Sequence, residues 1–362
     1  MPRQITREDY EKQKRQITFQ VNKIIEPEVN EILAGIDESI KPFFVSLWNN
    51  RKKRAKSNGR LRDMTIFLIL QMLGVKKINL DHKRVIAAGE FYNMASYYQN
   101  WHLDNKKSVN TDFDAKLCHL ASHLYREKAH ELINKTSFET QIKLALLSDL
   151  SESNKAIQKG QAFELAGARI IDQKNECFEK VLSNCLTRCK YMSGRFYGAS
   201  FAMGPIMAKA NKEDIDAFRQ IGTEFGTGAQ IINDVGDFCL VKSLVQLSEK
   251  DYQDQFADLV KGTMTLPIYE LSKCIDLEKF YPKSLTQKEK EYLLLQLVQN
   301  KCFHSSRKES NKLMKSMSRN LKKFPKSMYR DMLGFQIGTL FQCNKFYVNL
   351  RENHDYIWGN HK

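Results

Sequence analysis

The chain has 362 residues, a length that allows one large domain and does not require two. It carries 57 Lys and Arg against 42 Asp and Glu, giving a formal net charge of +15, and 42% of its residues are hydrophobic, so a packed core can form. Gly and Pro number only 17 and 7, which favours long helices and argues against a fold of many strands joined by tight turns.

Helical periodicity dominates the chain from its start. The predicted helices are, in chain order, Thr6–Ala34, Ile40–Lys56, Leu61–Leu73, Asp81–Leu103, Phe113–Ile133, Lys135–Leu150, Lys155–Lys174, Glu176–Ala210, Lys212–Phe238, Leu266–Ile275 and Gln287–Asn300, with two more towards the C-terminus. The polar stretch Lys242–Gly262 is predicted to be a loop. Sustained period-two alternation, a fixed repeat and a low-complexity linker are all absent. We therefore predict an all-α fold in which residues 1–362 form a single domain.

The sequence favours a soluble, cytoplasmic protein. Its first residues, MPRQITREDYEKQKRQ, are charged and lack the apolar stretch of a secretory signal. The longest apolar run, Met64–Val75, is interrupted by Gln71 and is too short to span a bilayer. The eight cysteines include no CxxC pair and no zinc-ligand spacing, so we expect reduced thiols.

Basic residues concentrate in two runs, Arg51–Lys56 and Arg307–Lys326. Charge of this kind can attract nucleic acid, anionic lipid or a polyphosphate substrate, and it can also be plain solvated surface. Neither run belongs to a nucleic-acid-binding motif, so we do not expect nucleic acid as a partner. The second run either holds the protein near an anionic membrane or is solvated surface.

An acidic motif, QIINDVGD, ends the predicted helix Lys212–Phe238. On a helix Asn233, Asp234 and Asp237 lie close enough to share one face, and oxygen donors of this kind suit hard cations. Alone the pattern is weak, because Asp pairs three residues apart are common on exposed helices. However, a second motif, DLVKGTMTLP, begins at Asp258, 21 residues after Asp237.

The pair of motifs QxxNDxxD and DLxxGxxTLP resembles the second aspartate-rich region of the trans-isoprenyl diphosphate synthase (polyprenyl synthetase) superfamily. Three further segments appear in the family's order. Gly59–Arg62 is similar to the basic GGKRxRP signature, Glu90–Ser96 to the helix before the first aspartate-rich motif, and Gly160–Leu165 to GQxxDL. The similarity is collinear from about residue 50 to residue 270.

The resemblance implies a class I isoprenoid synthase bundle, with two aspartate-rich helices facing each other across an apolar pocket. Magnesium ions at its mouth would bind the diphosphate of an allylic prenyl diphosphate and stabilise the leaving group, while the pocket keeps water from the carbocation. The metal ligands expected are Asp104, Asn100, Asn233, Asp234 and Asp237. Asp234, Asp237 and Asp104 would be the catalytic acids.

The first aspartate-rich motif departs from the family's DDxxD. Its place is held by Asn100-Trp101-His102-Leu103-Asp104, which keeps only the last carboxylate. Asn100 still offers a neutral oxygen four residues before Asp104. His102 is more often an ordinary surface or core histidine than a ligand for a hard metal.

The diphosphate-binding cations depart from the family as well. Gly59 stands at the family lysine of the basic signature, Met192-Ser193 at its Lys-Thr pair and Thr263 at the lysine of the last motif. Because cationic side chains bind diphosphate strongly, a conventional site for isopentenyl diphosphate is doubtful. The residues expected to bind substrate are Arg62, Arg60, Lys106, Lys107, Gln230, Asn93 and Lys261.

Three functions remain open at this point. The leading hypothesis is a magnesium-dependent prenyltransferase that transfers an allylic prenyl group to isopentenyl diphosphate or to another acceptor. The first alternative is a terpene synthase that cyclises the same substrate. The second is a non-catalytic subunit of a heterodimeric synthase, since the family forms dimers. A homodimer is the default expectation.

Overall fold

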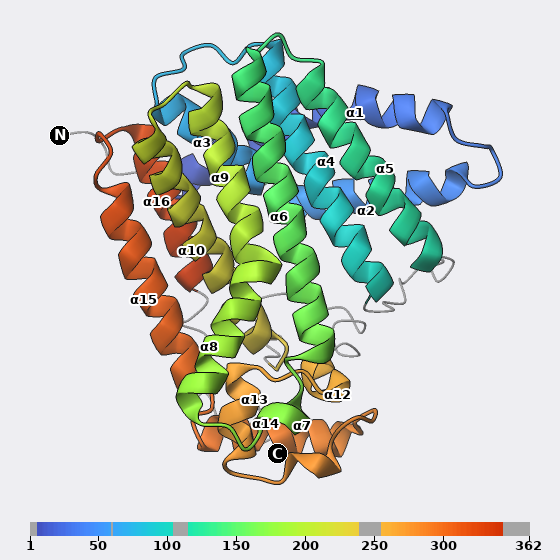
Figure 1. Ribbon diagram of the computed structural model, residues 1–362, viewed down its shortest axis with the longest axis vertical. Coiled ribbons are helices and arrows are strands. Elements are labelled where there is room, and N and C mark those ends of the chain that lie inside the picture. The colour runs from blue at the N-terminus through green and yellow to red at the C-terminus, as the bar shows by residue number, and fades with distance from the viewer. Residues whose placement is uncertain (1–5, 59–60, 104–114, 239–254, 343–362) are drawn as a thin grey trace. The chain divides into compact units, whose positions relative to one another are not determined.

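The computed structural model describes residues 6–58, 61–103, 115–238 and 255–342. Within these ranges every regular element is a helix, and the single β-bridge joins Arg169 to Thr263 (Figure 1). The predicted all-α class is therefore confirmed. The chain divides into two compact units, one of Met1–Ser151, Ala199–Arg219 and Phe324–Phe335, and one of Glu152–Gly198, Gln220–Lys323 and Gln336–Lys362. A single domain over residues 1–362 stays a prediction.

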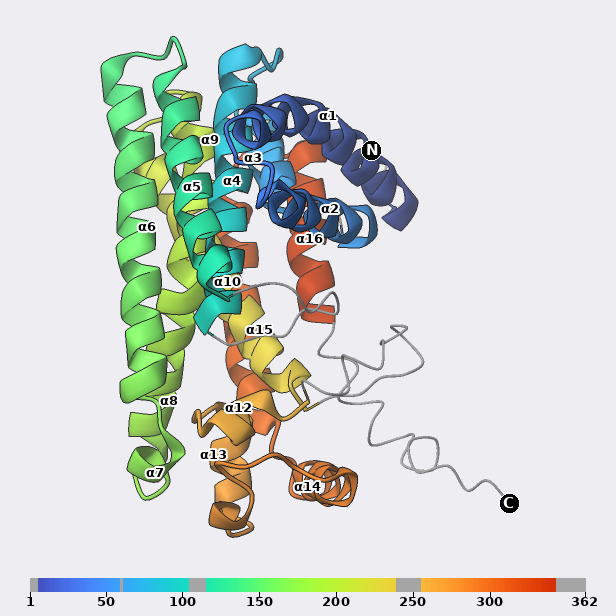
Figure 2. The same cartoon turned by 90° about the vertical axis from the view of Figure 1, so that its right-hand side faces the viewer.

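The first unit is built from long amphipathic helices. It contains α1 (Arg7–Ala34), α2 (Lys41–Asn58), α3 (Leu61–Met72), α4 (Leu80–Leu103), α5 (Ala115–Asn134) and parts of α6 (Thr140–Ala166), α9 (Arg195–Met207), α10 (Lys212–Gly236) and α16 (Met328–Gln342). In both ribbon views α4 and α5 run side by side (Figures 1 and 2). The core of α4 uses positions three and four apart, including Phe91, Met94, Ala95 and Tyr98, which are at most 1% exposed.

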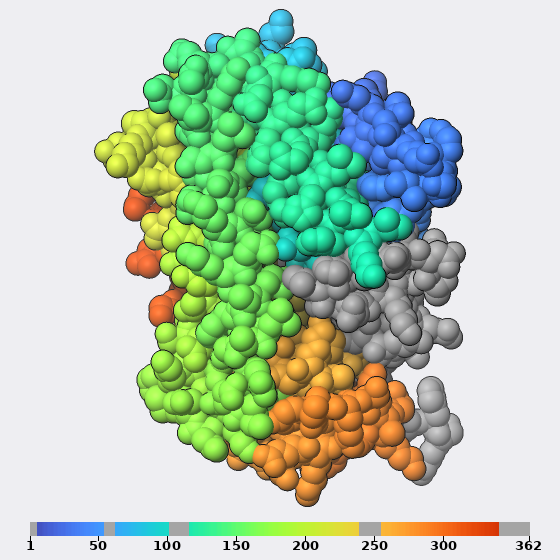
Figure 3. Space-filling model, turned by 45° about the vertical axis from the view of Figure 1, so that its right-hand side comes forward, coloured from blue at the N-terminus to red at the C-terminus, as the bar shows by residue number. Residues whose placement is uncertain are grey.

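The second unit contains the shorter helices and the remaining parts of α6, α9, α10 and α16. Its own elements are α7 (Ile170–Gln173), α8 (Phe178–Cys189), a π turn η1 (Lys190–Gly194), α12 (Ala257–Lys261), α13 (Leu266–Ser272), a 3₁₀ turn η2 (Leu277–Lys279), α14 (Gln287–Gln299) and α15 (His304–Leu321). One apolar cluster joins several of them, through Val181 of α8, Leu259 of α12, Leu266 of α13 and Leu293 of α14. In the space-filling view the segment from α12 to α14, coloured orange, forms one continuous surface (Figure 3).

The helix predicted over Glu176–Ala210 is present from Phe178 to Met207. It consists of α8, the π turn η1 and α9, which follow one another without a break. At this point the backbone of η1 packs directly against α10, because a Cβ on Gly226 would lie 2.5 Å from the Ser193 carbonyl oxygen. A π turn adds one residue to a helix and shifts the register of the turns after it. The helical prediction is confirmed over Phe178–Met207, and the π turn within it was not predicted because no local sequence pattern marks the glycine contact.

The helices predicted over Lys135–Leu150 and Lys155–Lys174 are one continuous helix, α6. The polar residues between them continue the helix instead of breaking it: Ser151 and Glu152 are exposed, and Ser153 is 2% exposed. The predicted loop Lys242–Gly262 lies partly outside the described residues, and its last part forms the short helix α12.

Candidate functional site

The acidic motif occupies the last turns of α10, and its two adjacent members face different surroundings. Asp234 is 4% exposed, whereas the neighbouring Asn233 is exposed. Consecutive helical residues point about 100° apart, so one of the two must turn inward when the helix is packed on one side. The Gln230 amide, one turn earlier, donates to Asp234 Oδ1 at 3.0 Å.

Asp234 is held by a buried arginine that the sequence analysis did not single out. The Arg188 guanidinium, 1% exposed, donates through Nη2 to Asp234 Oδ2 and through Nη1 to Glu164 Oε2 at 2.9 Å. The Cys189 thiol also donates to Asp234 Oδ2, at 3.7 Å. One cation thus ties α8 to both α6 and α10.

The position of Arg188 on α8 explains why this side chain is buried. The same position in the sequence could have identified Arg188 as a buried residue. The inward stripe of this helix contains Val181, Cys185 and Cys189, all at most 3% exposed, and Arg188 lies beside that stripe. An arginine among apolar helix positions needs buried acidic partners, because an unpaired buried charge is very costly. The signal was present in VLSNCLTRC, although nothing local identified the partners.

Asp237 forms the second contact of the motif and fixes the start of α12. Its Oδ1 accepts from the backbone N–H of Ala257 and its Oδ2 from that of Asp258, both at 3.1 Å. The first backbone N–H groups of a helix have no partner within it, so a carboxylate there satisfies them and suits the helix dipole. Asp237 therefore connects the two motifs that suggested the family.

The DLVKGTMTLP segment wraps around the end of α6. Gly262 ends α12 with φ of +77°, a conformation that glycine adopts without strain. The following strand-like residues pair with the segment after α6, where Met264 N–H donates to the Ala168 carbonyl at 2.6 Å and Ile170 N–H to the Gly262 carbonyl at 2.8 Å. Pro267 then lies in the first turn of α13, where its missing N–H costs nothing.

The cluster holds more negative than positive charge. Asp234, Asp258 and Glu164 lie around the buried cation Arg188, while Asp237 is influenced by Asp234 and by the exposed Lys261. Burial raises the pKa of Asp234, which Arg188 lowers in part, and burial also raises the pKa of Asp237. Burial, and then the charges of Asp237 and Asp234, raise the pKa of Asp258 well above its usual range. Each carboxyl thus makes its neighbours harder to ionise, and added positive charge would relieve the repulsion.

The donor set on α10 fits a hard cation such as magnesium. Asn233 presents an exposed amide oxygen, and Asp237, one turn later, is half-buried with one hydrogen bond on each oxygen, which leaves lone pairs on both. Across the ranges that the structure describes, however, no three His, Cys, Asp or Glu side chains are placed to share one ion. An ion here would therefore retain several waters, as magnesium commonly does.

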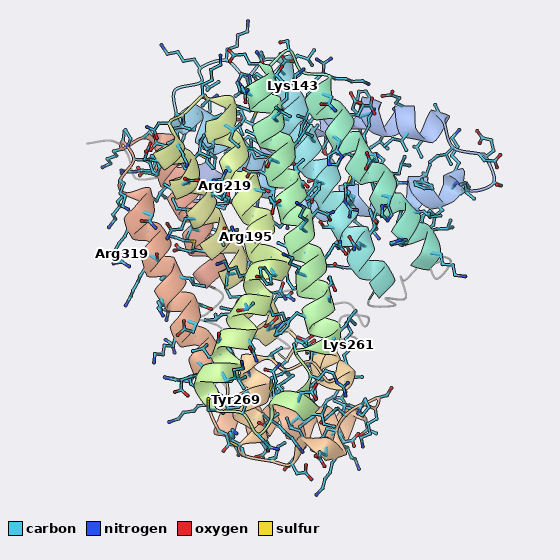
Figure 4. All side chains as sticks on the ribbon, in the orientation of Figure 1. Lys143, Arg195, Arg219, Lys261, Tyr269 and Arg319 are labelled. Carbon is cyan, nitrogen blue, oxygen red and sulfur yellow. The ribbon has the colours of Figure 1, made fainter. Side chains whose placement is uncertain are left out.

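The other predicted residues lie in separate places. Lys261 ends α12, is exposed, and its charge lowers the pKa of Asp237 slightly (Figure 4). Arg62 on α3, and Asn93 and Asn100 on α4, are half-buried residues of the first unit. The remaining four lie outside the described residues: Arg60, Asp104, Lys106 and Lys107. The predicted facing of the two aspartate-rich motifs stays a prediction.

Asn93 belongs to a buried ion-pair network in the first unit. Glu90 is fully buried and accepts from the Arg51 guanidinium in a two-pronged contact, Nη2 to Oε2 at 3.0 Å. The Asn93 amide donates to the same Oε2 at 3.3 Å. Arg51, the first residue of the basic run Arg51–Lys56, thereby forms an ion pair with α4. The sequence analysis did not identify it as a structural cation, because a run of basic residues is typical of solvated surface.

The fold and the two linked motifs define the class of the protein. The polyprenyl synthetase family model matches residues 104–291, just over half of the chain. The protein belongs to the polyprenyl synthetase family, as the resemblance predicted.

Two curated relatives agree with this assignment. A chloroplastic solanesyl diphosphate synthase 2 from Arabidopsis thaliana is 22% identical over 296 residues, which cover 76% of this chain and 64% of the plant enzyme. The chain thus spans slightly less than two thirds of that relative. A short chain isoprenyl diphosphate synthase from Methanocaldococcus jannaschii is 23% identical over 260 residues, covering 68% of this chain and 74% of the archaeal enzyme.

Solved structures share the fold at low identity. A geranylgeranyl pyrophosphate synthetase from Pyrococcus horikoshii Ot3 matches with a TM-score of 0.73 and 18% identity, over 92% of this chain and 99% of that one. A polyprenyl synthase from Caulobacter crescentus CB15, complexed with calcium and isoprenyl diphosphate, matches with a TM-score of 0.69 and 16% identity, over 90% and 97%. None of the described helices is both long and apolar enough to cross a membrane.

Proposed function

We propose that the protein is a magnesium-dependent prenyltransferase that ionises an allylic prenyl diphosphate and transfers the prenyl group to an acceptor. The observation that carries the proposal is the linked pair of motifs, in which Asp237 at the end of α10 caps α12 within an acidic cluster short of positive charge. A family member of the same fold has been solved with calcium and isoprenyl diphosphate, and this supports a divalent cation and a diphosphate as ligands here.

Within this proposal the residues of the motif have distinct roles. Asp237 and Asn233 provide oxygen donors on the exposed side of α10, where bound magnesium would neutralise the leaving diphosphate. Lys261, one turn beyond Asp258, adds an exposed ammonium that can bind diphosphate oxygens. Asp234 serves mainly to hold the end of α10 in place, because it is 4% exposed and is ion-paired with the buried Arg188. Asp104 remains the proposed donor from the first motif.

A non-catalytic role is the second candidate, and one observation favours it. Arg188 supplies a buried positive charge inside the cluster, and Asp234 is thereby engaged away from solvent. A chain of this kind could stabilise an active partner in a heterodimer instead of turning over substrate itself. A homodimer and a cytoplasmic location stay predictions.

An activity assay separates these functions. The purified chain is incubated with geranyl, farnesyl or geranylgeranyl diphosphate and magnesium, with and without isopentenyl diphosphate. Longer prenyl diphosphates indicate transfer, and hydrocarbons or alcohols formed without the acceptor indicate cyclisation. Folded protein that consumes none of these substrates, but does so once a second family member is added, would support the non-catalytic subunit and contradict the proposal.

Asp237→Asn tests the assigned site directly. It removes one charge and keeps an acceptor for one of the two N–H groups that start α12, so we expect a modest loss of stability, a folded protein, and a fall in turnover of about 100-fold or more. Asp216→Asn, the same change at an exposed position of α10, is the matched control and should stay within about twofold of the unchanged protein. Equal activities of the two variants would remove Asp237 from the site.

A further inference from the structure

One face of α15 carries a dense line of positive charge. The exposed Lys and Arg side chains on or directly after this helix are Arg307, Lys308, Lys312, Lys315, Arg319, Lys322 and Lys323. The only acidic residue between His304 and Lys323 is Glu309, which is 8% exposed and is 3.7 Å from the Lys312 ammonium. The exposed face of this helix is therefore cationic along its whole length.

The cations form a straight row. Lys308, Lys312, Lys315, Arg319 and Lys322 succeed one another at alternating intervals of four and three residues, which matches the helical repeat. At a rise of about 1.5 Å per residue, the row is about 21 Å long. Together with Asn311, Met314 and Ser318, these five residues line an open depression along the helix. Arg319 points away from the neighbouring helices (Figure 4).

The opposite face of α15 is fixed against the rest of the second unit. Ser306, Ser310 and Met317 are at most 2% exposed, and the Ser316 hydroxyl donates to Glu224 Oε1 of α10 at 2.9 Å. The helix therefore cannot roll to turn its basic row inward. The row is therefore open to solvent or to a partner with negative charge over the residues that the structure describes.

We propose that the basic row of α15 binds the surface of an anionic lipid bilayer. A straight row on the flank of a packed bundle presents all five cations to a flat surface at once, and juxtamembrane cations are attracted to anionic headgroups. None of the large hydrophobic side chains found exposed in the described residues lies on α15, so the contact is electrostatic and does not involve insertion. Binding should therefore weaken steeply with salt.

Nucleic acid is a less suitable partner for the same surface. A recognition helix must protrude to enter a groove about 12 Å wide, whereas α15 is embedded along one side. Stacking on single-stranded bases needs exposed aromatic rings, and the sequence from His304 to Lys323 contains no Phe, Tyr or Trp. A row of cations without aromatic rings is better suited to bind the phosphate headgroups of a flat bilayer than to bind nucleic-acid bases.

The test is sedimentation of the full chain with vesicles, at low and at high salt. One vesicle type contains only phosphatidylcholine, and the other also contains about one third phosphatidylserine. The test variant changes the five cations of the row to Gln: Lys308, Lys312, Lys315, Arg319 and Lys322. The control variant changes five exposed lysines elsewhere to Gln: Lys76, Lys77, Lys155, Lys159 and Lys288. Both variants lose five positive charges, and thermal melting checks that both fold.

We expect the unchanged protein to bind only the anionic vesicles, and to release them at high salt. The row variant should lose at least about tenfold in partition coefficient, while the control variant keeps most of it. No binding to anionic vesicles, or equal losses in both variants, overturns the proposal. So does row-dependent binding to single-stranded RNA or duplex DNA, measured by fluorescence anisotropy, if vesicles are not bound. The experiment needs no turnover, so it stands or fails separately from the proposed enzyme activity.

Discussion

At the scale of single residues, Arg188 determines which carboxylates of the candidate site are held inside the second unit. A buried guanidinium that contacts two carboxylates is stabilising only as part of the whole network, because each member was removed from water at a cost. The bond from Arg188 to Asp234 therefore makes the acidic motif a structural element of the second unit as well as a candidate ligand set. Loss of activity on changing Asp234 would therefore reflect both roles.

Arg188→Met should destabilise the fold by about 3–5 kcal/mol, because Asp234 and Glu164 would stay buried without their counter-ion. In that background, Asp234→Asn should cost less than it does in the unchanged protein, with a coupling of at least about 1 kcal/mol. Urea denaturation of the four proteins of the cycle measures both quantities. Lys155→Met, which removes an exposed pair, should leave the midpoint nearly unchanged. Strict additivity in the cycle would contradict the buried ion pair.

The cysteines give a pH-dependent test of burial. Burial, with a smaller effect of the neighbouring Cys274, raises the pKa of Cys302 to about 12, and burial raises that of Cys185 to about 12. Between pH 7 and 9 both should remain thiols that react slowly with maleimide, while the exposed Cys177 and Cys274 should be labelled readily because the reagent can reach them. A raised pKa of an acid means that the folded state holds the proton more tightly than the unfolded state. The stability due to these two groups therefore falls as pH rises from about 9 towards 12. Mass spectrometry of labelled peptides measures each site.

At the scale of elements, the contact of the π turn η1 with α10 determines how the candidate site is assembled. Gly226 and Gly194 allow the two backbones to approach, since a Cβ on Gly194 would lie 2.5 Å from the Thr227 hydroxyl. The approach comes directly after α8, and α8 is the helix that presents Arg188 to α10. Close packing of these elements and the ion pair therefore depend on each other.

Gly226→Ala should destabilise the protein by about 1–3 kcal/mol, because the new methyl group would overlap the Ser193 carbonyl and the Gly194 backbone. Gly338→Ala on α16 is the matched control. A Cβ there meets nothing within 4 Å, so the change should be neutral or stabilising by up to about 1 kcal/mol through helix propensity. Thermal melts of both variants measure the difference. A neutral Gly226→Ala would show that the two helices do not touch as described.

The sequence predicted where the helices lie along the chain, but it did not predict which helices contact one another. Hydrophobic periodicity identified the long helices, and the spacing of Asp237 and Asp258 identified the two motifs that meet in the structure. Arg188 and Glu164 were not predicted as site residues, because their partners lie 46 and 24 residues away along the chain. Sequence spacing also placed Asn233 and Asp234 on one face, whereas packing of α10 separates them into an exposed and a buried side chain.

At the scale of the whole molecule, the helical architecture is retained while most side chains differ. The two solved structures named above are 16% and 18% identical to this chain and still match over at least 90% of it. Bundles of amphipathic helices tolerate such divergence because hydrophobic residues of similar size can replace one another in a core.

Magnesium together with inorganic diphosphate should raise the unfolding temperature of the whole protein, because ligands that bind only the folded state stabilise it. At about one hundred times the dissociation constant, the gain is about 2.7 kcal/mol, equivalent to several degrees. Differential scanning fluorimetry measures it, and EDTA should abolish it. Asp237→Asn should reduce the shift, whereas Asp216→Asn should not. A shift from diphosphate that is equal with and without magnesium would contradict a metal-dependent site.

The triad of Glu164, Arg188 and Asp234 also constrains how this protein could have diverged. Arg188 alone would be harmful without acidic partners, and Asp234, once it adapted to that cation, would lose support on its removal. Such mutual dependence is epistasis, and it restricts the order in which substitutions can be accepted. Among related sequences, an arginine at this place in α8 should therefore occur together with both acids, even though α6, α8 and α10 are far apart along the chain.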